Sequence, residues 1–70
     1  MRLSTRNQLP GTVVSVVLGE AMAVVKIKLD GSEQVITSSI TRDAAVDLGL
    51  KAGAAVVALV KSTEVAIGVE

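Results

Sequence analysis

The sequence predicts an all-β fold with one short helix, and three observations lead to this prediction. Apolar residues, many of them valine or isoleucine, recur in short continuous or alternating runs that are typical of β-strands. Breaks that contain glycine separate these runs at the intervals expected for tight turns. Only residues 41–49 carry helix start and stop signals.

Two strands are expected in the first part of the chain. Residues 11–18 form a β-branched run between Pro10-Gly11 and Gly19, and such a continuous apolar run predicts a strand buried on both faces. Residues 22–29 alternate instead, with Val25 and Ile27 on one face and lysines on the other. This alternation predicts a half-exposed strand.

A hairpin is expected to join the second strand to a third. Asp30-Gly31 lies between alternating segments, and we predict a type I′ turn there, in which both central residues take positive φ. The returning strand is predicted over residues 34–40.

The helix is expected to begin after Thr41 as its N-cap, with Asp43 in the first turn and Gly49 at C′. Residues 50–53 predict a turn, and residues 54–60 predict a second buried strand. In a final alternating strand, Val65, Ile67 and Val69 share one face. This order predicts a small antiparallel barrel of OB type, in one domain over residues 1–70.

Composition favours an oligomer and argues against most catalytic chemistry. A chain of 70 residues buries a marginal core by itself, and half of its residues are apolar, with a mean hydropathy of +0.61. Cysteine and histidine are both absent, which removes disulfides, thiolate nucleophiles and imidazole bases. We therefore expect a homo-oligomer that is not an enzyme and has no organic cofactor.

Nucleic acid and membrane are not expected partners. The formal net charge is zero, and no aromatic residue is available to stack on bases. No apolar run reaches the roughly 20 residues that span a bilayer, and no signal-peptide pattern follows Met1. We expect the protein to be cytoplasmic.

Two short clusters combine cations with hydroxyl groups and contain no carboxylate, so that either is suited to an oxyanion. On composition alone, a polar strand start and a polar break between strands explain both clusters better than a binding site does. The clusters are Ser4-Thr5-Arg6-Asn7-Gln8 and Lys61-Ser62-Thr63.

Residues 4–11 resemble the S-x-R-N-x-x-x-G signature that opens the Mop domains of molbindins. Residues 35–41, VITSSIT, are similar to that family's VITASIT stretch, and residues 48–53 and 60–65 resemble its LGLKEG and VKSTEV segments. The resemblance implies an OB-like barrel with strands exchanged between subunits. It also implies a hexamer that binds molybdate or tungstate at subunit interfaces, with no bare metal cation.

The resemblance assigns the oxyanion contacts to both clusters. Arg6 and Lys61 would supply charge, and Ser4 and Ser62 would donate from their hydroxyls. Thr5 and Asn7 would contribute backbone, and Thr63 is a weaker candidate. For the Asn7 side chain we favour a structural role that ties the start of the strand to the following turn.

A possible second site would involve Gly19, Ser38 and Ser39, although exposed strand hydroxyls are the favoured explanation of the serine pair. Many family members carry Asn where this chain has Met22, and Glu20 adds an acid beside Gly19. This departure puts a secondary site there in doubt.

The expected role is storage or buffering of the anion. The first alternative is a molybdate-sensing module of a transporter or transcription factor, which the same domain type forms in longer proteins. The second is a structural oligomerisation module whose polar clusters only solvate strand ends.

Overall fold

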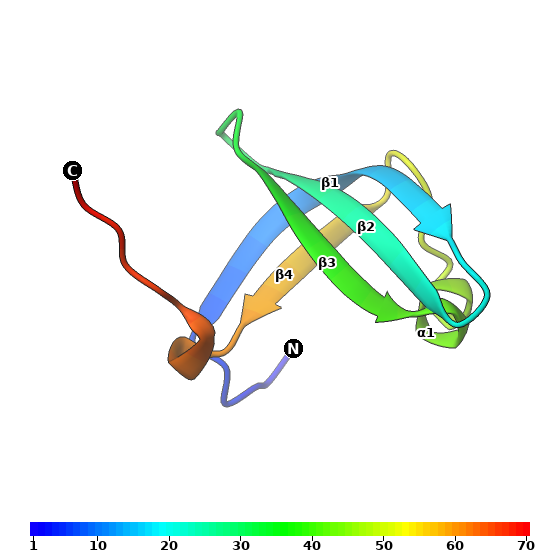
Figure 1. Cartoon of the computed structure of the whole chain (residues 1–70), viewed down its shortest axis with the longest axis horizontal. Coiled ribbons are helices and arrows are strands. Elements are labelled where there is room, and N and C mark those ends of the chain that lie inside the picture. Colours follow the sequence, from blue (N-terminus) through cyan, green and yellow to red (C-terminus); the bar gives the residue numbers. More distant parts are fainter.

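The computed structural model describes all 70 residues, and its main element is one antiparallel sheet. The strands β1 (Asn7–Leu18), β2 (Met22–Leu29), β3 (Val35–Thr41) and β4 (Ala55–Val60) lie in the order β3-β2-β1-β4 (Figure 1). The helix α1 (Arg42–Asp47) follows β3, and a single 3-10 turn, η1 (Ser62–Glu64), follows β4. The predicted all-β class with one short helix is confirmed.

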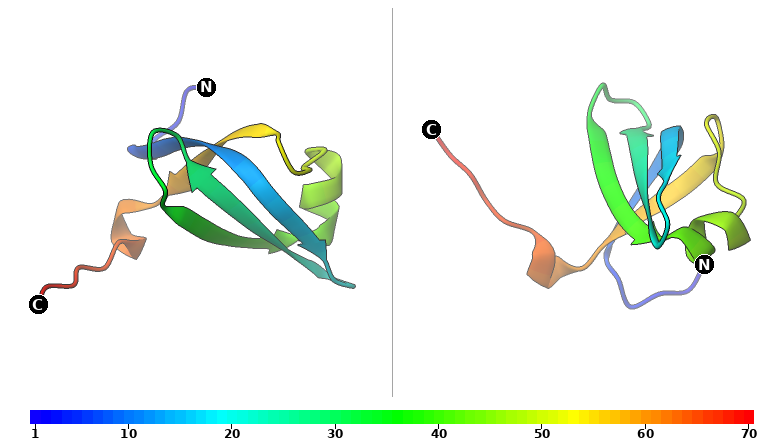
Figure 2. Two further views of the ribbon diagram at one scale, coloured as in Figure 1. Left: turned by 90° about the horizontal axis from the view of Figure 1, so that it is seen from above. Right: turned by 45° about the vertical axis from the view of Figure 1, so that its right-hand side comes forward.

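The sheet curls into a half-barrel whose edge strands, β3 and β4, are not paired with each other (Figure 2). A bulge in β1 contributes to this curl, because Val13 and Ser15 pair with the consecutive residues Ile27 and Lys26 and leave Val14 as an extra residue. Bulges of this kind bend a strand and increase its twist.

β1 begins four residues earlier than predicted. The predicted boundary at Pro10-Gly11 is wrong, because Pro10 lies within the strand and pairs with Val57 of β4 although proline has no N–H to donate. Its carbonyl accepts from the Asp30 N–H at 3.0 Å, on the side of β2. The missing N–H faces that same side, where the regular pairing with β2 starts only at Gly11, so no ladder bond is lost.

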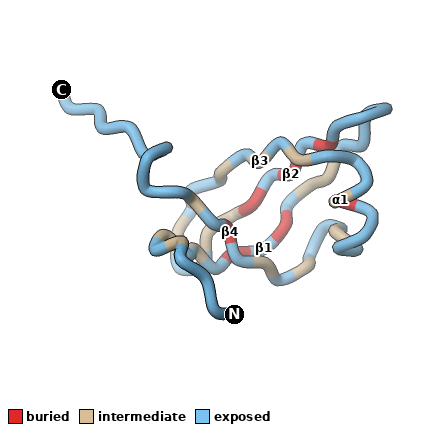
Figure 3. Tube along the Cα trace, turned by 90° about the horizontal axis from the view of Figure 1, so that it is seen from below, coloured by how far each residue is buried: buried red, intermediate tan, exposed pale blue.

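The core occupies one face of the sheet. Val13, Val25, Ile27 and Ala58 form its buried centre, and Figure 3 shows buried positions within the strands and at one place in α1. The prediction that β1 and β4 are buried on both faces is wrong for the single chain, because no second layer covers the outer face. Val14 and Val17 are accordingly 50% and 64% exposed.

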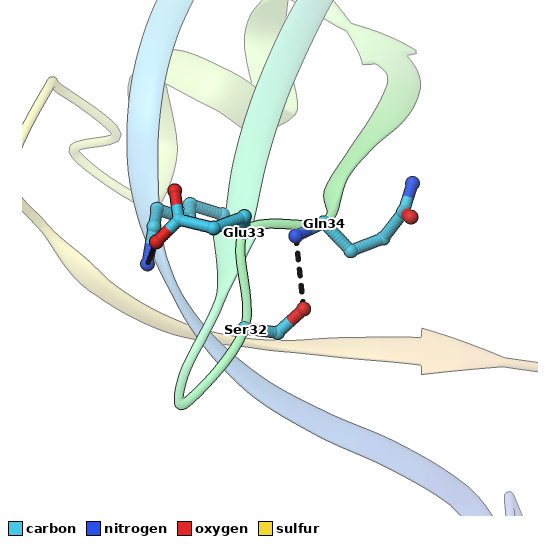
Figure 4. A network of polar contacts seen from close by, with 4 residues as sticks. Ser32, Glu33 and Gln34 are labelled. Carbon is cyan, nitrogen blue, oxygen red and sulfur yellow. Dashed lines mark hydrogen bonds and ion pairs between the residues drawn. The ribbon is translucent and has the colours of Figure 1, made fainter.

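The loop between β2 and β3 is longer than the predicted two-residue type I′ turn. Only Gly31 has a positive φ, at +72°, and the Leu29 N–H donates to the Gln34 carbonyl across a four-residue loop. The Ser32 hydroxyl accepts from the Gln34 N–H at 2.9 Å, and Lys28 reaches Glu33 at 4.0 Å (Figure 4). These polar contacts favour the wider loop, so β3 starts at Val35.

The helix forms as predicted. The Thr41 hydroxyl accepts from the Ala44 N–H at 3.1 Å, Asp43 lies in the first turn, and Gly49 has φ +63° just after the C-cap, Leu48. α1 buries Ala45 and contacts β2 and β3 at one end of the half-barrel. With six residues, it is too short to cross a membrane, and no longer helix is present.

The predicted final strand does not form within the chain. After η1, residues 65–70 extend away from the body without a ladder partner (Figures 1 and 2). Val65, Ile67 and Val69 are 51%, 85% and 92% exposed. The segment is extended, as its alternation predicts. It is not a strand of the sheet, because it pairs with neither edge strand of its own chain.

Gly11 provides a test of this packing, because a Cβ there would lie 2.6 Å from the Lys28 carbonyl oxygen and 2.7 Å from Ile27 Cγ2. We expect Gly11→Ala to lower the free energy of unfolding by about 2–3 kcal/mol through overpacking, measured by urea denaturation. Thr12→Ala, at the neighbouring exposed position, is the control. Equal stability of both variants would contradict the close approach of β1 and β2.

Candidate functional site

The structure brings the two polar clusters together in one hollow, where β1 begins and β4 ends. The hollow has a volume of about 460 Å³ and contains no hydrophobic and no acidic residue. Its lining residues are Ser4, Thr5, Arg6, Lys61, Ser62 and Thr63.

The antiparallel pairing of β1 with β4 explains why the two ends of the chain meet. Asn7, the first residue of β1, pairs with Val60, the last residue of β4. The residues before Asn7 and those after Val60 therefore leave the sheet at the same point. η1 turns the second segment back so that Lys61, Ser62 and Thr63 face one hollow with the first.

The hollow is rich in hydrogen-bond donors that the chain itself does not use. Arg6 and Lys61 take part in no ion pair, because the one ion pair of the chain joins Lys28 to Glu33. The backbone N–H groups of Thr5, Arg6, Ser62 and Thr63 donate no hydrogen bond within the chain. Two cations, four hydroxyls and free N–H groups, with no carboxylate, are suited to an oxyanion whose oxygens all accept.

In the single chain this hollow is open to solvent. Every lining residue except the half-buried Thr5 is exposed. A dianion bound there would keep water on one side, unless a further surface covers it.

Asn7 and Gln8 belong to the first cluster in sequence but do not line the hollow. The Asn7 side-chain amide donates to the Val60 carbonyl at 3.0 Å, in a partly buried bond between residues 53 apart. The Asn7 side chain therefore ties the start of β1 to the end of β4, and not to the following turn as predicted. The Gln8 side-chain amide donates to the Thr5 carbonyl at 2.8 Å.

The residues of the possible second site are not brought together in the chain. Ser38 lies on the inner side of β3 and Ser39 on the outer side. Gly19 lies in the β1–β2 turn, where its carbonyl accepts from Arg42 at 2.9 Å. Sequence reasoning missed this contact of Arg42, because no local pattern links residues 23 positions apart.

Sequence reasoning also missed an apolar groove on the inner side of the half-barrel. It has a volume of about 400 Å³, and 11 of its 13 lining residues are hydrophobic. Both edge strands contribute, with Ile36 and Ile40 from β3 and Val56 and Ala58 from β4, and Leu48 lies at the end of α1. The alternation of each strand indicated an apolar inner face. It could not show that β3 and β4 stay unpaired, and this open edge is what exposes the groove.

No cluster of three or more histidine, cysteine, aspartate or glutamate residues occurs in the structure. The hollow itself offers hydrogen-bond donors and two cations, and no carboxylate lines it.

Comparison with protein families finds that the TOBE domain matches residues 3–67. Molybdenum-pterin-binding protein 3 of Clostridium pasteurianum is 45% identical over 67 residues, which cover 96% of this chain and 97% of the relative.

Two solved structures are similar to the chain in fold and sequence. MopII from Clostridium pasteurianum, in an apo form, superposes with a TM-score of 0.89 at 43% identity, covering 97% of this chain and all of that one. The cytoplasmic molybdate-binding protein ModG, with molybdate bound, gives 0.84 at 39% identity. That alignment covers 89% of this chain but 43% of ModG.

Asn7 tests how the two halves of the hollow are held together. We expect Asn7→Ala to lower the free energy of unfolding by about 1 kcal/mol in a urea titration, because a partly buried bond to the Val60 carbonyl is lost. Asn7→Asp keeps the size but cannot donate, so it should be at least as destabilising. Wild-type stability of both variants would show that this bond does not hold β1 to β4.

Proposed function

Because the chain belongs to the TOBE domain family as a molbindin-type protein, we propose that it binds molybdate, and tungstate, at subunit interfaces to store or buffer the anion. The hollow that contains only donors and cations carries this proposal. The molybdate-bound state of the similar protein ModG supports the choice of ligand.

In this proposal Arg6 and Lys61 offset the two negative charges of the anion, and the hydroxyls of Ser4 and Ser62 donate to its oxygens. Thr5 and Asn7 contribute through the backbone, and Thr63 is a secondary contact. Such a site favours a fully deprotonated dianion, because the remaining O–H of hydrogen phosphate would face another donor. Sulfate is also fully deprotonated, so we propose that the larger size of molybdate and tungstate separates them from it.

The exposed surface supports assembly. The chain exposes 5403 Å², whereas a compact monomer of 7.1 kDa is expected to expose about 4,100 Å². The excess, about 1,300 Å², is larger than the roughly 800 Å² that one partner buries in a stable interface. We propose a homo-oligomer, and specifically the hexamer that the resemblance implies.

We propose that residues 65–70 of one subunit fill the apolar groove of another, so that this segment is exchanged between subunits. Val65, Ile67 and Val69 offer one apolar face, and the groove lies beside the unpaired edges of β3 and β4. Because Lys61–Thr63 directly precede this segment, docking of the segment would place the hollow at a subunit interface. Anion binding and assembly would then stabilise each other.

We also propose that the protein acts in the cytoplasm and has no catalytic activity. ModG is described as a cytoplasmic molybdate-binding protein, and the relatives are named for binding. A role as a structural assembly module is the second candidate, because the excess exposed surface accounts for association without any ligand. A sensing role within a longer protein is a further alternative.

Isothermal titration calorimetry with molybdate, against sulfate and phosphate, tests the function. We expect saturable binding of molybdate and weak or no heat with the other two anions, and Arg6→Ala should weaken binding by about 1.5–3 kcal/mol. Arg2→Ala, which alters a cation outside the hollow, should bind normally. No heat with any anion would favour the structural assembly module, and unchanged affinity of the Arg6 variant would remove Arg6 from the site.

Strand exchange is tested by placing a charge on the apolar face of residues 65–70. We expect Ile67→Asp to lower the oligomer mass, measured by light scattering, because a carboxylate would enter the apolar groove. The control is Ala66→Asp, on the opposite face of the extended segment, and it should leave the mass unchanged. An unchanged mass for Ile67→Asp would exclude docking of this segment.

A further inference from the structure

Gln8 is the residue of the first polar cluster to which the proposed function gives no role. It lies at the start of β1, where its backbone pairs with Leu59 of β4. Its exposed side chain turns back, and the amide donates to the Thr5 carbonyl at 2.8 Å. Thr5 itself lines the hollow, so this bond joins the regular sheet to the wall of the site.

We propose that Gln8 is a positioning residue for the oxyanion. It holds the Thr5 carbonyl away from the hollow and thereby turns the Arg6 N–H toward the bound anion. This inference rests on the proposed function, since it concerns the orientation of one donor in the same site.

The geometry of the peptide bond explains the effect. The chain has no cis peptide bond, so the Thr5 carbonyl and the Arg6 N–H of the same peptide unit point in opposite directions. The carbonyl is bound by Gln8, whereas the Arg6 N–H donates to no group of the chain. If this peptide unit turned over, a carbonyl oxygen would face the dianion and one donor would be lost.

No other hydrogen bond fixes this peptide unit. Thr5 and Arg6 precede β1, which begins at Asn7, and therefore lie outside the pairing with β4. The Gln8 backbone, by contrast, is held in that pairing. The Gln8 side chain thus connects the paired strand to a segment that has no ladder hydrogen bonds of its own.

Gln8→Met tests the proposal, because it keeps the length of the side chain and removes the donor. We expect the Kd for molybdate to rise roughly 3- to 10-fold in calorimetry, the range of one uncharged hydrogen bond. The urea midpoint without ligand should stay at the wild-type value, since the bond is exposed. Gln34→Met is the matched control, because it removes an exposed glutamine amide at the far loop and should leave Kd unchanged.

A second measurement separates positioning from a general effect on the fold. In the wild-type protein, molybdate should shift the Arg6 amide resonance in a ¹⁵N spectrum, and Gln8→Met should reduce this shift while the β1–β4 resonances stay in place. Gln8→Glu, which cannot donate and adds a negative charge, should raise Kd further.

The outcomes distinguish molybdate binding by the chain from the role of Gln8 in that binding. If the wild-type chain takes up no molybdate, the proposed function is wrong and the inference falls with it. If the wild-type chain binds molybdate and the two Gln8 variants match its Kd, only the role of Gln8 is wrong. A raised Kd with an unchanged Arg6 shift would likewise overturn the positioning of that N–H.

Discussion

The antiparallel pairing of β1 with β4 is the interaction on which the rest of the structure depends. It joins residues 53 positions apart where Asn7 lies opposite Val60, and it continues to Thr12 opposite Ala55. It places Val13 and Ala58 in one core and leaves β4 as an open edge of the sheet. It also makes the segment before β1 and the segment after β4 leave the sheet side by side, which creates the hollow. The core and the candidate site therefore have the same origin.

A single curled sheet leaves this chain with more apolar surface than it can cover. Only seven of its 70 residues are buried, and its inner groove stays open between two edge strands. Two cations and four hydroxyl groups, by contrast, gather where β1 begins and β4 ends, at the hollow that we propose a neighbouring copy closes. Association of subunits would cover both the open groove and the open hollow. For this reason we propose that ligand binding and assembly are linked.

Sequence patterns predicted the parts of the structure that local interactions determine. The helix was placed correctly because Thr41 and Gly49 act within one turn of it. Both polar clusters were identified, but composition alone did not show that they meet, because that depends on strand pairing across the whole chain. Pro10 misled the prediction since its tolerance depends on where β2 ends. The free final segment could not be foreseen, because its alternation is that of a strand but no strand of the chain pairs with it.

We propose that the segments before β1 and after β4 build an oxyanion site between subunits. Crystals grown with molybdate, with diffraction recorded on both sides of a molybdenum absorption edge, would locate the anion directly. Our account predicts an anomalous peak in the hollow between Arg6 and Lys61, closed by a neighbouring copy. A peak at another place, or no peak from crystals grown in excess molybdate, would contradict this prediction.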